Sequence, residues 1–295
     1  MSDDRRPLLV TGVPRSGTTW AARLLATAPG TALAGREPMN PRGRQYALGG
    51  TLTGWARLTD PTDRQRRVLR STYAGRNPRT YGRYGRHQWR GPLATTRLVV
   101  KDPFAMLSTP AIAAVTGARA VQVYRHPGAV LTSYRRMGWH PDLDEIAPFV
   151  AEAAAGFPEL GEAWERGAGD LTEAERMGVF WGVLQALALA DLDAAPGSLF
   201  VAHHEVAAGG LPAVEALFAE LGLTPTPETE REMHQGGDSP TPSSGSQLHQ
   251  LHRSPAEVAQ AWRRKLDAEE IAQVESVASG VLAAVEARRL SLPLG

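Results

Sequence analysis

The chain has 295 residues, no cysteine and a formal net charge of +1. The absence of cysteine excludes disulfide bonds, thiolate metal sites and cysteine nucleophiles. No stretch approaches the roughly 20 consecutive apolar residues that cross a bilayer, and the N-terminal residues lack the apolar core of a signal peptide. We therefore expect a cytoplasmic protein without a membrane partner.

The small net charge hides a division of the chain into a basic and an acidic half. Residues 1–138 carry 23 Arg or Lys and 6 Asp or Glu, whereas residues 139–295 carry 9 and 25. A strongly basic segment usually binds an anionic ligand or polymer. We expect such a ligand to be held mainly by the first half.

The first predicted element is a short buried strand at residues 8–10. It runs into Thr-Gly-Val-Pro-Arg-Ser-Gly-Thr-Thr-Trp at 11–20 and then into a helix predicted over 18–28. A strand that turns through glycines into a helix aims backbone N–H groups at one point, which is typical of phosphate binding. The spacing approaches the nucleoside-triphosphate loop Gly-x4-Gly-Lys-Ser/Thr, but Thr18 replaces the lysine and Arg15 supplies the cation. The segment predicts a phosphate site that does not bind ATP; an ordinary strand–turn–helix corner is the alternative.

The rest of the basic half contains little periodic pattern. A strand is predicted at 31–34 and a helix at 63–73, separated by an irregular segment over 35–60. In residues 74–97, arginines are interleaved with tyrosine, histidine and tryptophan. We interpret residues 35–97 as the acceptor-binding loop or flap. Stacking on nucleic acid and a solvated flap without a ligand are the alternatives.

Two further strand–helix units follow. Strands are predicted at 98–100 and 120–124, with helices near 110–116 and 130–137. Alternating strands and helices predict an α/β fold of three layers, P-loop-like, with a central, mostly parallel sheet flanked by helices.

Cations follow the ends of three of these predicted strands. Arg15, Lys101 and Arg125 each come directly after a strand or its turn. Ligands of parallel α/β sheets collect at the carboxyl ends of the strands. The topology therefore predicts a polyanion pocket lined by these three side chains.

The second half of the chain is predicted to be helical around a single further strand at 198–202. Residues 235–254, rich in Gly, Ser and Pro, predict a mobile loop. No domain boundary is evident, so we expect residues 1–295 to form one domain. The predicted helices span about 142–155, 172–194, 211–221, 256–264 and 267–289.

Two motifs resemble those of the sulfotransferases that use 3′-phosphoadenosine 5′-phosphosulfate (PAPS). Residues 14–20, Pro-Arg-Ser-Gly-Thr-Thr-Trp, resemble the 5′-phosphosulfate loop in the form with arginine that is common in bacterial members. Residues 124–133, Tyr-Arg-His-Pro-Gly-Ala-Val-Leu-Thr-Ser, resemble the 3′-phosphate motif, which pairs an arginine with a serine eight residues later. Lys-Asp-Pro at 101–103 and the segments 218–223 and 262–266 resemble further parts of the same family.

The resemblance implies a donor site for PAPS, with 3′-phosphoadenosine 5′-phosphate (PAP) as the product. The donor has anionic groups at both ends of its ribose and needs two anion sites, which a single phosphate loop does not provide. Trp20 is expected to stack on the adenine, with a core tryptophan as the alternative. The implied donor-binding residues are Arg15, Ser16, Gly17, Thr18, Thr19, Trp20, Arg125, Ser133, Arg253 and Ser254.

The family uses a histidine or a glutamate as the base, and the resemblance implies Glu37 here. Glu37 is the only carboxylate in residues 5–59. An ion pair with Arg36 or Arg42 is the alternative role for this side chain. His87 is a second candidate for the base.

The remaining catalytic roles follow from the same resemblance. Arg15 is expected to stabilise the leaving phosphate, and Lys101 either contacts the transferring group or supports the pocket. No metal is expected, because the sulfuryl group carries less charge than a phosphoryl group. We interpret His203, His204 and Glu205 as a polar junction rather than a metal site.

The sequence thus predicts a sulfotransferase that moves a sulfuryl group to a hydroxyl of a small-molecule, natural-product or carbohydrate acceptor, with no nucleic-acid partner. A P-loop small-molecule kinase is the first alternative, with Asp102 as its magnesium ligand. A non-enzymatic protein that binds polyanions or nucleic acid is the second.

Overall fold

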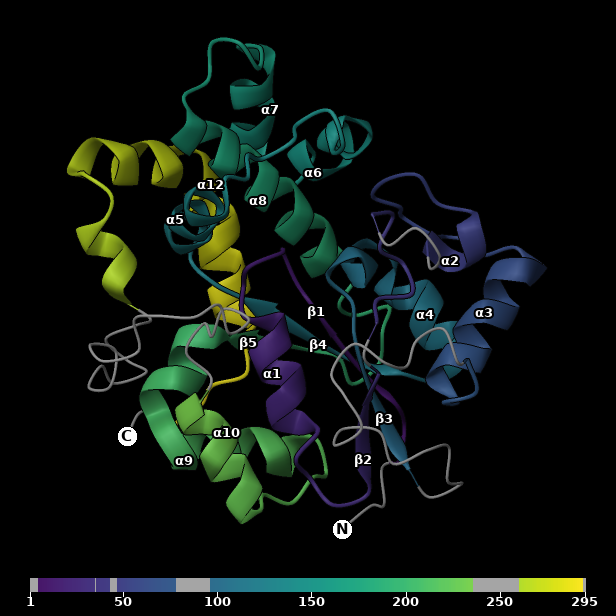
Figure 1. The fold of residues 1–295 in the computed structure, drawn as a ribbon. Helices are drawn as coiled ribbons and strands as arrows, with labels where there is room; N and C mark the ends of the chain where they lie inside the picture. The colour runs from purple at the N-terminus through teal and green to yellow at the C-terminus, as the bar shows by residue number, and fades with distance from the viewer. Residues whose placement is uncertain (1–4, 35, 43–46, 78–95, 236–259, 294–295) are drawn as a thin grey trace.

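A five-stranded parallel sheet forms the centre of the protein (Figure 1). The computed structural model describes residues 5–34, 36–42, 47–77, 96–235 and 260–293. The strand order is β2-β3-β1-β4-β5, which confirms the predicted α/β class with helices on both faces. The strands are β1 (Leu8–Thr11), β2 (Thr31–Ala34), β3 (Arg97–Lys101), β4 (Arg119–Tyr124) and β5 (Leu199–Ala202).

The helices predicted in the first half lie close to observed ones, but a short helix at Ala47–Gly50 and a 3-10 segment at Pro103–Ser108 were not predicted. Within the described residues, the 3-10 segments are η3 (Pro103–Ser108), η4 (Ala147–Phe149) and η5 (Ala261–Arg264). The α-helices are α1 (Thr18–Leu25), α2 (Ala47–Gly50), α3 (Asp63–Tyr73), α4 (Thr109–Thr116), α5 (Pro127–Met137), α6 (Val150–Ala154), α7 (Pro158–Glu165), α8 (Glu173–Ala190), α9 (His203–Glu220), α10 (Pro227–Gln235) and α12 (Ala268–Arg288).

Several elements of the second half differ from the prediction. The helix predicted over about 142–155 is observed as η4 and the short α6, and the described end of the helix predicted over 256–264 is the 3-10 segment η5. Helices α7 and α10 occupy segments for which no helix was predicted, and α9 begins at His203 instead of residue 211. The backbone of α9 is broken at Gly210, where φ is 60° and ψ is −144°. Pro212 follows at the start of the second part, a position where proline is favoured, so the predicted helix corresponds to that second part alone.

Side chains that alternate along the strands build a separate core on each face of the sheet. Leu9 and Val100 pack with helices α4, α5, α8 and α12, whereas Leu8, Val10 and Val99 pack with α1 and α9 on the opposite face. Successive strand residues point to opposite faces, so strands buried on both faces are apolar throughout. This burial places β1 at the centre, with its carboxyl end between those of β3 and β4.

Helix α8 is the central helix of the larger core and fixes the end of β4. It begins at a capping box between Thr172 and Glu175 and is buried along most of its length, with α12 packed along it. The indole of Trp181, fully buried, donates its Nε1–H to the backbone carbonyl of Arg125 at 3.0 Å. The residue that directly follows β4 is therefore held by a hydrogen bond from the core.

His126 caps the start of α5. Its Nδ1 accepts a hydrogen bond from the N–H of Gly128 at 3.2 Å, so the proton of the neutral ring is on Nε2, 3.4 Å from a carboxylate oxygen of Glu275. The imidazole stacks on Trp262 at 4.2 Å between ring centroids. Burial, with the nearby Arg263 and His204, lowers the pKa of His126 from 6.5 to about 4.

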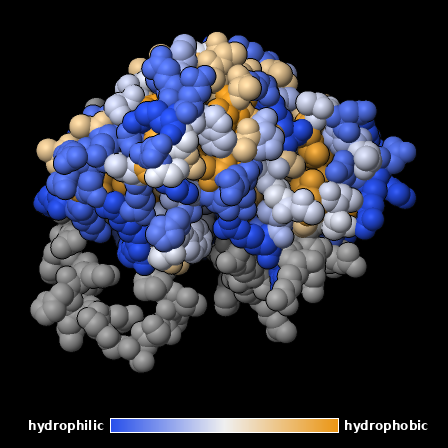
Figure 2. Space-filling view, turned by 90° about the horizontal axis from the view of Figure 1, so that it is seen from above, coloured by the Kyte–Doolittle hydropathy of each residue, from blue (hydrophilic) through white to orange (hydrophobic). Residues whose placement is uncertain are grey.

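Hydrophilic side chains cover most of the face of the molecule that Figure 2 shows. On this face they surround several separate apolar areas. Met137 and Trp139 are the exposed large apolar side chains of the described residues. In the part of the chain that the structure describes, no helix has both the length and the apolar character needed to cross a membrane.

The close approach of β1 to β4 makes Gly12 the most sterically restricted position of the phosphate loop. Its φ is 144°, and a Cβ there would lie 2.1 Å from the backbone oxygen of Val123. We expect Gly12→Ala to lower the unfolding free energy by more than about 3 kcal/mol, from backbone strain and overpacking together. Gly138→Ala is the matched control, since Gly138 also has positive φ but open space around it, and should cost about 1 kcal/mol. Urea unfolding measures both; equal losses would contradict the steric assignment.

The lowered pKa of His126 predicts a stability that depends on pH. Between pH 4 and pH 6.5 the unfolded chain binds more protons at this residue than the folded chain, so stability falls as the pH drops through that range. His126→Asn keeps an N-cap acceptor and does not titrate. The advantage of the wild type over this variant should shrink by up to about 3 kcal/mol between pH 7 and pH 4. Urea unfolding at a series of pH values tests this, and a constant difference would contradict it.

Candidate active site

The segment between β1 and α1 has the geometry of an anion site. The helix starts after Gly17, whose φ is 95°, with no side-chain cap and no acidic residue in the first turn. Backbone N–H groups at such a helix end are available to an anion. Arg15, also at positive φ (75°), lies inside the same turn. Residues 12–17 therefore form a loop that contains its own cation, Arg15.

Two buried polar atoms, one in this loop and one in the first turn of α1, fit a bound group. Within the described residues, Ser16 Oγ and Trp20 Nε1 are buried and have no hydrogen-bond partner. Such atoms are uncommon in native proteins and call for an explanation such as a ligand. Thr18 is buried and Thr19 is exposed, so the two threonines differ in their access to solvent.

A hydrogen bond joins the two predicted phosphate motifs. Arg15 donates its Nε–H to the hydroxyl of Ser133 at 3.0 Å, although 118 residues separate them. Ser133 lies on α5, which follows β4 in the sheet, whereas Arg15 follows β1. Adjacent parallel strands thus place the predicted 5′ and 3′ anion sites next to each other.

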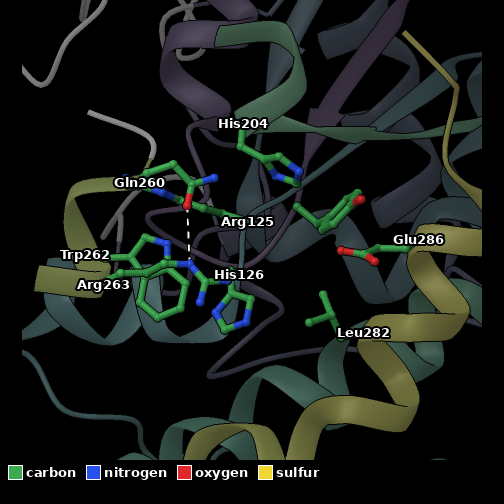
Figure 3. Close-up of a pocket in the computed structure, with 9 residues that line it drawn as sticks. Arg125, His126, His204, Gln260, Trp262, Arg263, Leu282 and Glu286 are labelled. Carbon is green, nitrogen blue, oxygen red and sulfur yellow. Dashed lines mark hydrogen bonds between the residues drawn. The ribbon is translucent and has the colours of Figure 1, made fainter. Parts of the chain in front are cut away.

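A cavity opens beside the second motif, at the end of β4 (Figure 3). Arg125, His126 and the η5 residues Trp262 and Arg263 lie on one side of it, and Glu286 of α12 lies on the other. Two arginines make the first side cationic. The complete lining is Tyr124, Arg125, His126, His204, Gln260, Trp262, Arg263, Leu282 and Glu286.

Glu37 and Lys101 form a buried ion pair at the ends of β2 and β3. The ammonium of Lys101 contacts one carboxylate oxygen of Glu37, and the amide of Asn40 donates to the other. The expected alternative partner Arg42 is instead paired with Glu145 at 3.2 Å. Two predicted catalytic residues are therefore in direct contact.

Asp102 lies directly beside this ion pair and is fully buried. Burial raises the pKa of Asp102 from 3.8 to about 8, and the charge of Glu37 adds to the effect, while Lys101 and two backbone N–H donors oppose it. Both oxygens of its carboxyl group accept backbone hydrogen bonds, from Met39 at 2.6 Å and from Phe104 at 3.1 Å. Its complete burial leaves no part of the carboxyl group open to solvent.

His203 contributes to the phosphate loop in a way that the sequence did not suggest. A Cβ on Gly17 would lie 2.1 Å from its ring, and its ring packs edge-on against Trp20 at 5.2 Å between centroids. Its place at the carboxyl end of β5 is the signal that could have identified it. Glu205 accepts a hydrogen bond from Arg289 at 2.7 Å. No group of three or more metal-ligating side chains occurs within the described ranges.

Some predicted residues cannot be placed in this geometry. Arg253 and Ser254, proposed to close the donor site, and His87, the second candidate for the base, lie outside the described residues. The predicted mobile loop after residue 235 and most of the aromatic and arginine-rich stretch lie outside them as well.

Solved structures of sulfotransferases resemble this chain at low identity, and no curated protein matches it. The sulfotransferase domain of the Synechococcus PCC 7002 olefin synthase is 16% identical, with a TM-score of 0.46 over 93% of this chain and 96% of that one. The sulfotransferase domain of the curacin biosynthetic pathway is also 16% identical, with a TM-score of 0.49 over 93% and 97%. Sulfotransferase STF1 of Mycobacterium tuberculosis H37Rv is 19% identical, with a TM-score of 0.39 over 88% and 76%.

A family model matches more than half of the chain. The model, described as "Sulfotransferase family", covers residues 7–176. This range contains the phosphate loop, the Glu37–Lys101 pair, and the motif of Arg125 and Ser133. The chain belongs to the sulfotransferase family.

Proposed function

We propose that the protein transfers the sulfuryl group of PAPS to a hydroxyl of a small-molecule, natural-product or carbohydrate acceptor, without a metal. The hydrogen bond between Arg15 and Ser133 is the observation that supports this most directly. It brings together two anion-binding motifs, and PAPS has two separate anionic groups to be bound. A triphosphate donor needs a single phosphate loop and no second motif.

The residues of the proposed donor site fall into two sets, one for each anionic group of PAPS. Residues 15–20 would bind the phosphosulfate through the free N–H groups at the start of α1 and the guanidinium of Arg15. Arg125 and Ser133 would bind the 3′-phosphate by charge-assisted hydrogen bonds. The unpartnered Nε1 of Trp20 is a further donor for the nucleotide.

Glu37 would accept the proton of the acceptor hydroxyl while the oxygen of that hydroxyl attacks the sulfur of PAPS. The bond between sulfur and the bridging oxygen of the 5′-phosphate breaks, and the electron pair leaves with PAP, whose charge Arg15 stabilises. Lys101 and Asn40 each donate to one oxygen of Glu37 and so fix the carboxylate plane. A carboxylate oxygen has two acceptor positions, so one remains for the acceptor hydroxyl.

The burial of Asp102 argues against the kinase alternative. A magnesium ion needs accessible carboxylate oxygens, but Asp102 is fully buried and both of its oxygens accept backbone N–H groups. Magnesium-dependent ATP hydrolysis by the purified protein would restore that alternative.

We also infer that residues 1–295 form a single sulfotransferase domain in the cytoplasm. The larger core is shared by the sheet and by α12 near the C-terminus, so the second half contributes to the same core as the first. A proteolytic fragment that ends before α12 and still folds would contradict the inference.

Comparison of two nucleotides tests the donor assignment. Arg125→Ala should lower the affinity for PAP roughly 10- to 100-fold and leave the affinity for adenosine 5′-phosphate unchanged, since only PAP carries a 3′-phosphate. Arg15→Ala should lower the affinity for both nucleotides. Titration calorimetry at constant salt measures each affinity. If Arg125→Ala lowered the affinity for PAP and for adenosine 5′-phosphate equally, the assignment of Arg125 to the 3′-phosphate would be wrong.

Glu37→Gln tests the base. The amide cannot accept the proton, so kcat should fall at least about 100-fold while the affinity for PAP stays within twofold. Glu145→Gln is the matched control, because it removes a carboxylate that pairs with Arg42 on the same segment and should keep wild-type kcat. Transfer from labelled PAPS across an acceptor panel gives the rates. Retained turnover in Glu37→Gln would remove this residue from the mechanism.

A further inference from the structure

Asp102 contacts the segment that carries Glu37, and the proposed reaction assigns it no role. Its Oδ2 accepts the N–H of Met39 at 2.6 Å, two residues beyond Glu37. Its own N–H donates to the carbonyl of Val10 in β1 at 3.0 Å. Asp102 thus links the central strand of the sheet to the backbone of the Glu37 segment.

Through the short backbone from Glu37 to Met39, the hydrogen bond to Asp102 restrains the position of the Glu37 side chain. Pro38 has its φ restricted by its ring, and a residue that precedes proline is restricted as well. Few dihedral angles therefore separate the Met39 N–H from the Glu37 side chain. The side chain of Met39 is fully buried, so the segment cannot rotate about this hydrogen bond without exposing it.

Consecutive residues of β3 and its end hold the segment at two points. Lys101 contacts the carboxylate of Glu37, and Asp102 contacts the backbone beyond it. The contact with Lys101 orients the carboxylate of Glu37. The contact with Asp102 fixes the position of the Glu37 Cα. A carboxyl group suits the second contact, because one of its oxygens accepts the N–H of Met39 while the other accepts the N–H of Phe104 at the start of η3.

Resting on the proposed function, we propose that Asp102 is a positioning residue that holds the Glu37 segment at the edge of the sheet through the Met39 N–H. The charged or titratable groups around it are Glu37 and Lys101, and Tyr73 at the end of α3, whose hydroxyl is buried. The Lys101 ammonium is a donor only, so it cannot accept the N–H of Met39 in place of Asp102.

Two variants separate this role from the cap of η3. Asp102→Asn offers one acceptor oxygen for two N–H donors. Asp102→Ser keeps a good N-cap for Phe104 but is too short to reach Met39. We expect kcat to fall at least tenfold in both, with the affinity for PAP within twofold of wild type. Amide hydrogen exchange, followed by mass spectrometry, should become at least tenfold faster in residues 36–42.

Asp191→Asn is the matched control, because Asp191 is a partly buried carboxylate that pairs with Arg57 far from this segment along the chain. It should keep wild-type kcat and wild-type exchange in residues 36–42. In the double variant Glu37→Gln/Asp102→Asn, kcat should equal that of Glu37→Gln alone, since Asp102 acts through Glu37.

The outcomes distinguish this inference from the proposed function. Unchanged exchange in residues 36–42 of both Asp102 variants would overturn the positioning role, whatever the activity. Faster exchange with unchanged kcat, or an additive loss in the double variant, would overturn it too. If the wild type neither binds PAP nor transfers sulfuryl groups, the proposed function fails, while the exchange data still decide whether Asp102 holds the segment.

Discussion

The parallel pairing of β1 with both β3 and β4 is the constraint on which the candidate site depends. It places the carboxyl ends of three strands at one edge of the sheet, and each strand is followed by a cation. Arg15 then reaches Ser133, and Lys101 reaches Glu37. A different strand order would separate these contacts, because parallel neighbours alone bring the ends of distant segments together.

The buried polar groups at this end of the sheet differ in whether other protein groups satisfy their hydrogen bonds. Glu37, Lys101 and Asp102 are buried and satisfied by one another or by backbone N–H groups. The loop after β1 instead keeps buried atoms without partners among the described residues. Burying charges is costly unless they are paired, so the first group is built as a fixed network. In the proposed function, the second group binds the donor.

The first half of the chain was easier to predict than the second for a physical reason. Helix α3 begins at a capping box and was predicted at its observed limits. In the second half, α7 and α10 were not predicted, and the backbone of α9 is broken at Gly210. Tertiary packing, more than local pattern, decides such helices. The large apolar helix α8, by contrast, was recognisable from its residues alone.

The sequence by itself determined the strand–helix alternation, and it predicted one anion site at the loop with Arg15 and a second at the motif with Arg125 and Ser133. These features are local, because turns, caps and strand ends depend on neighbouring residues. Only the tertiary structure decided that Lys101 is a partner of Glu37, and that Arg42 pairs with Glu145 instead. Such contacts depend on strand order and on how side chains share a buried space. Residues 37 and 101 meet because β2 lies beside β3, which no spacing along the chain reveals.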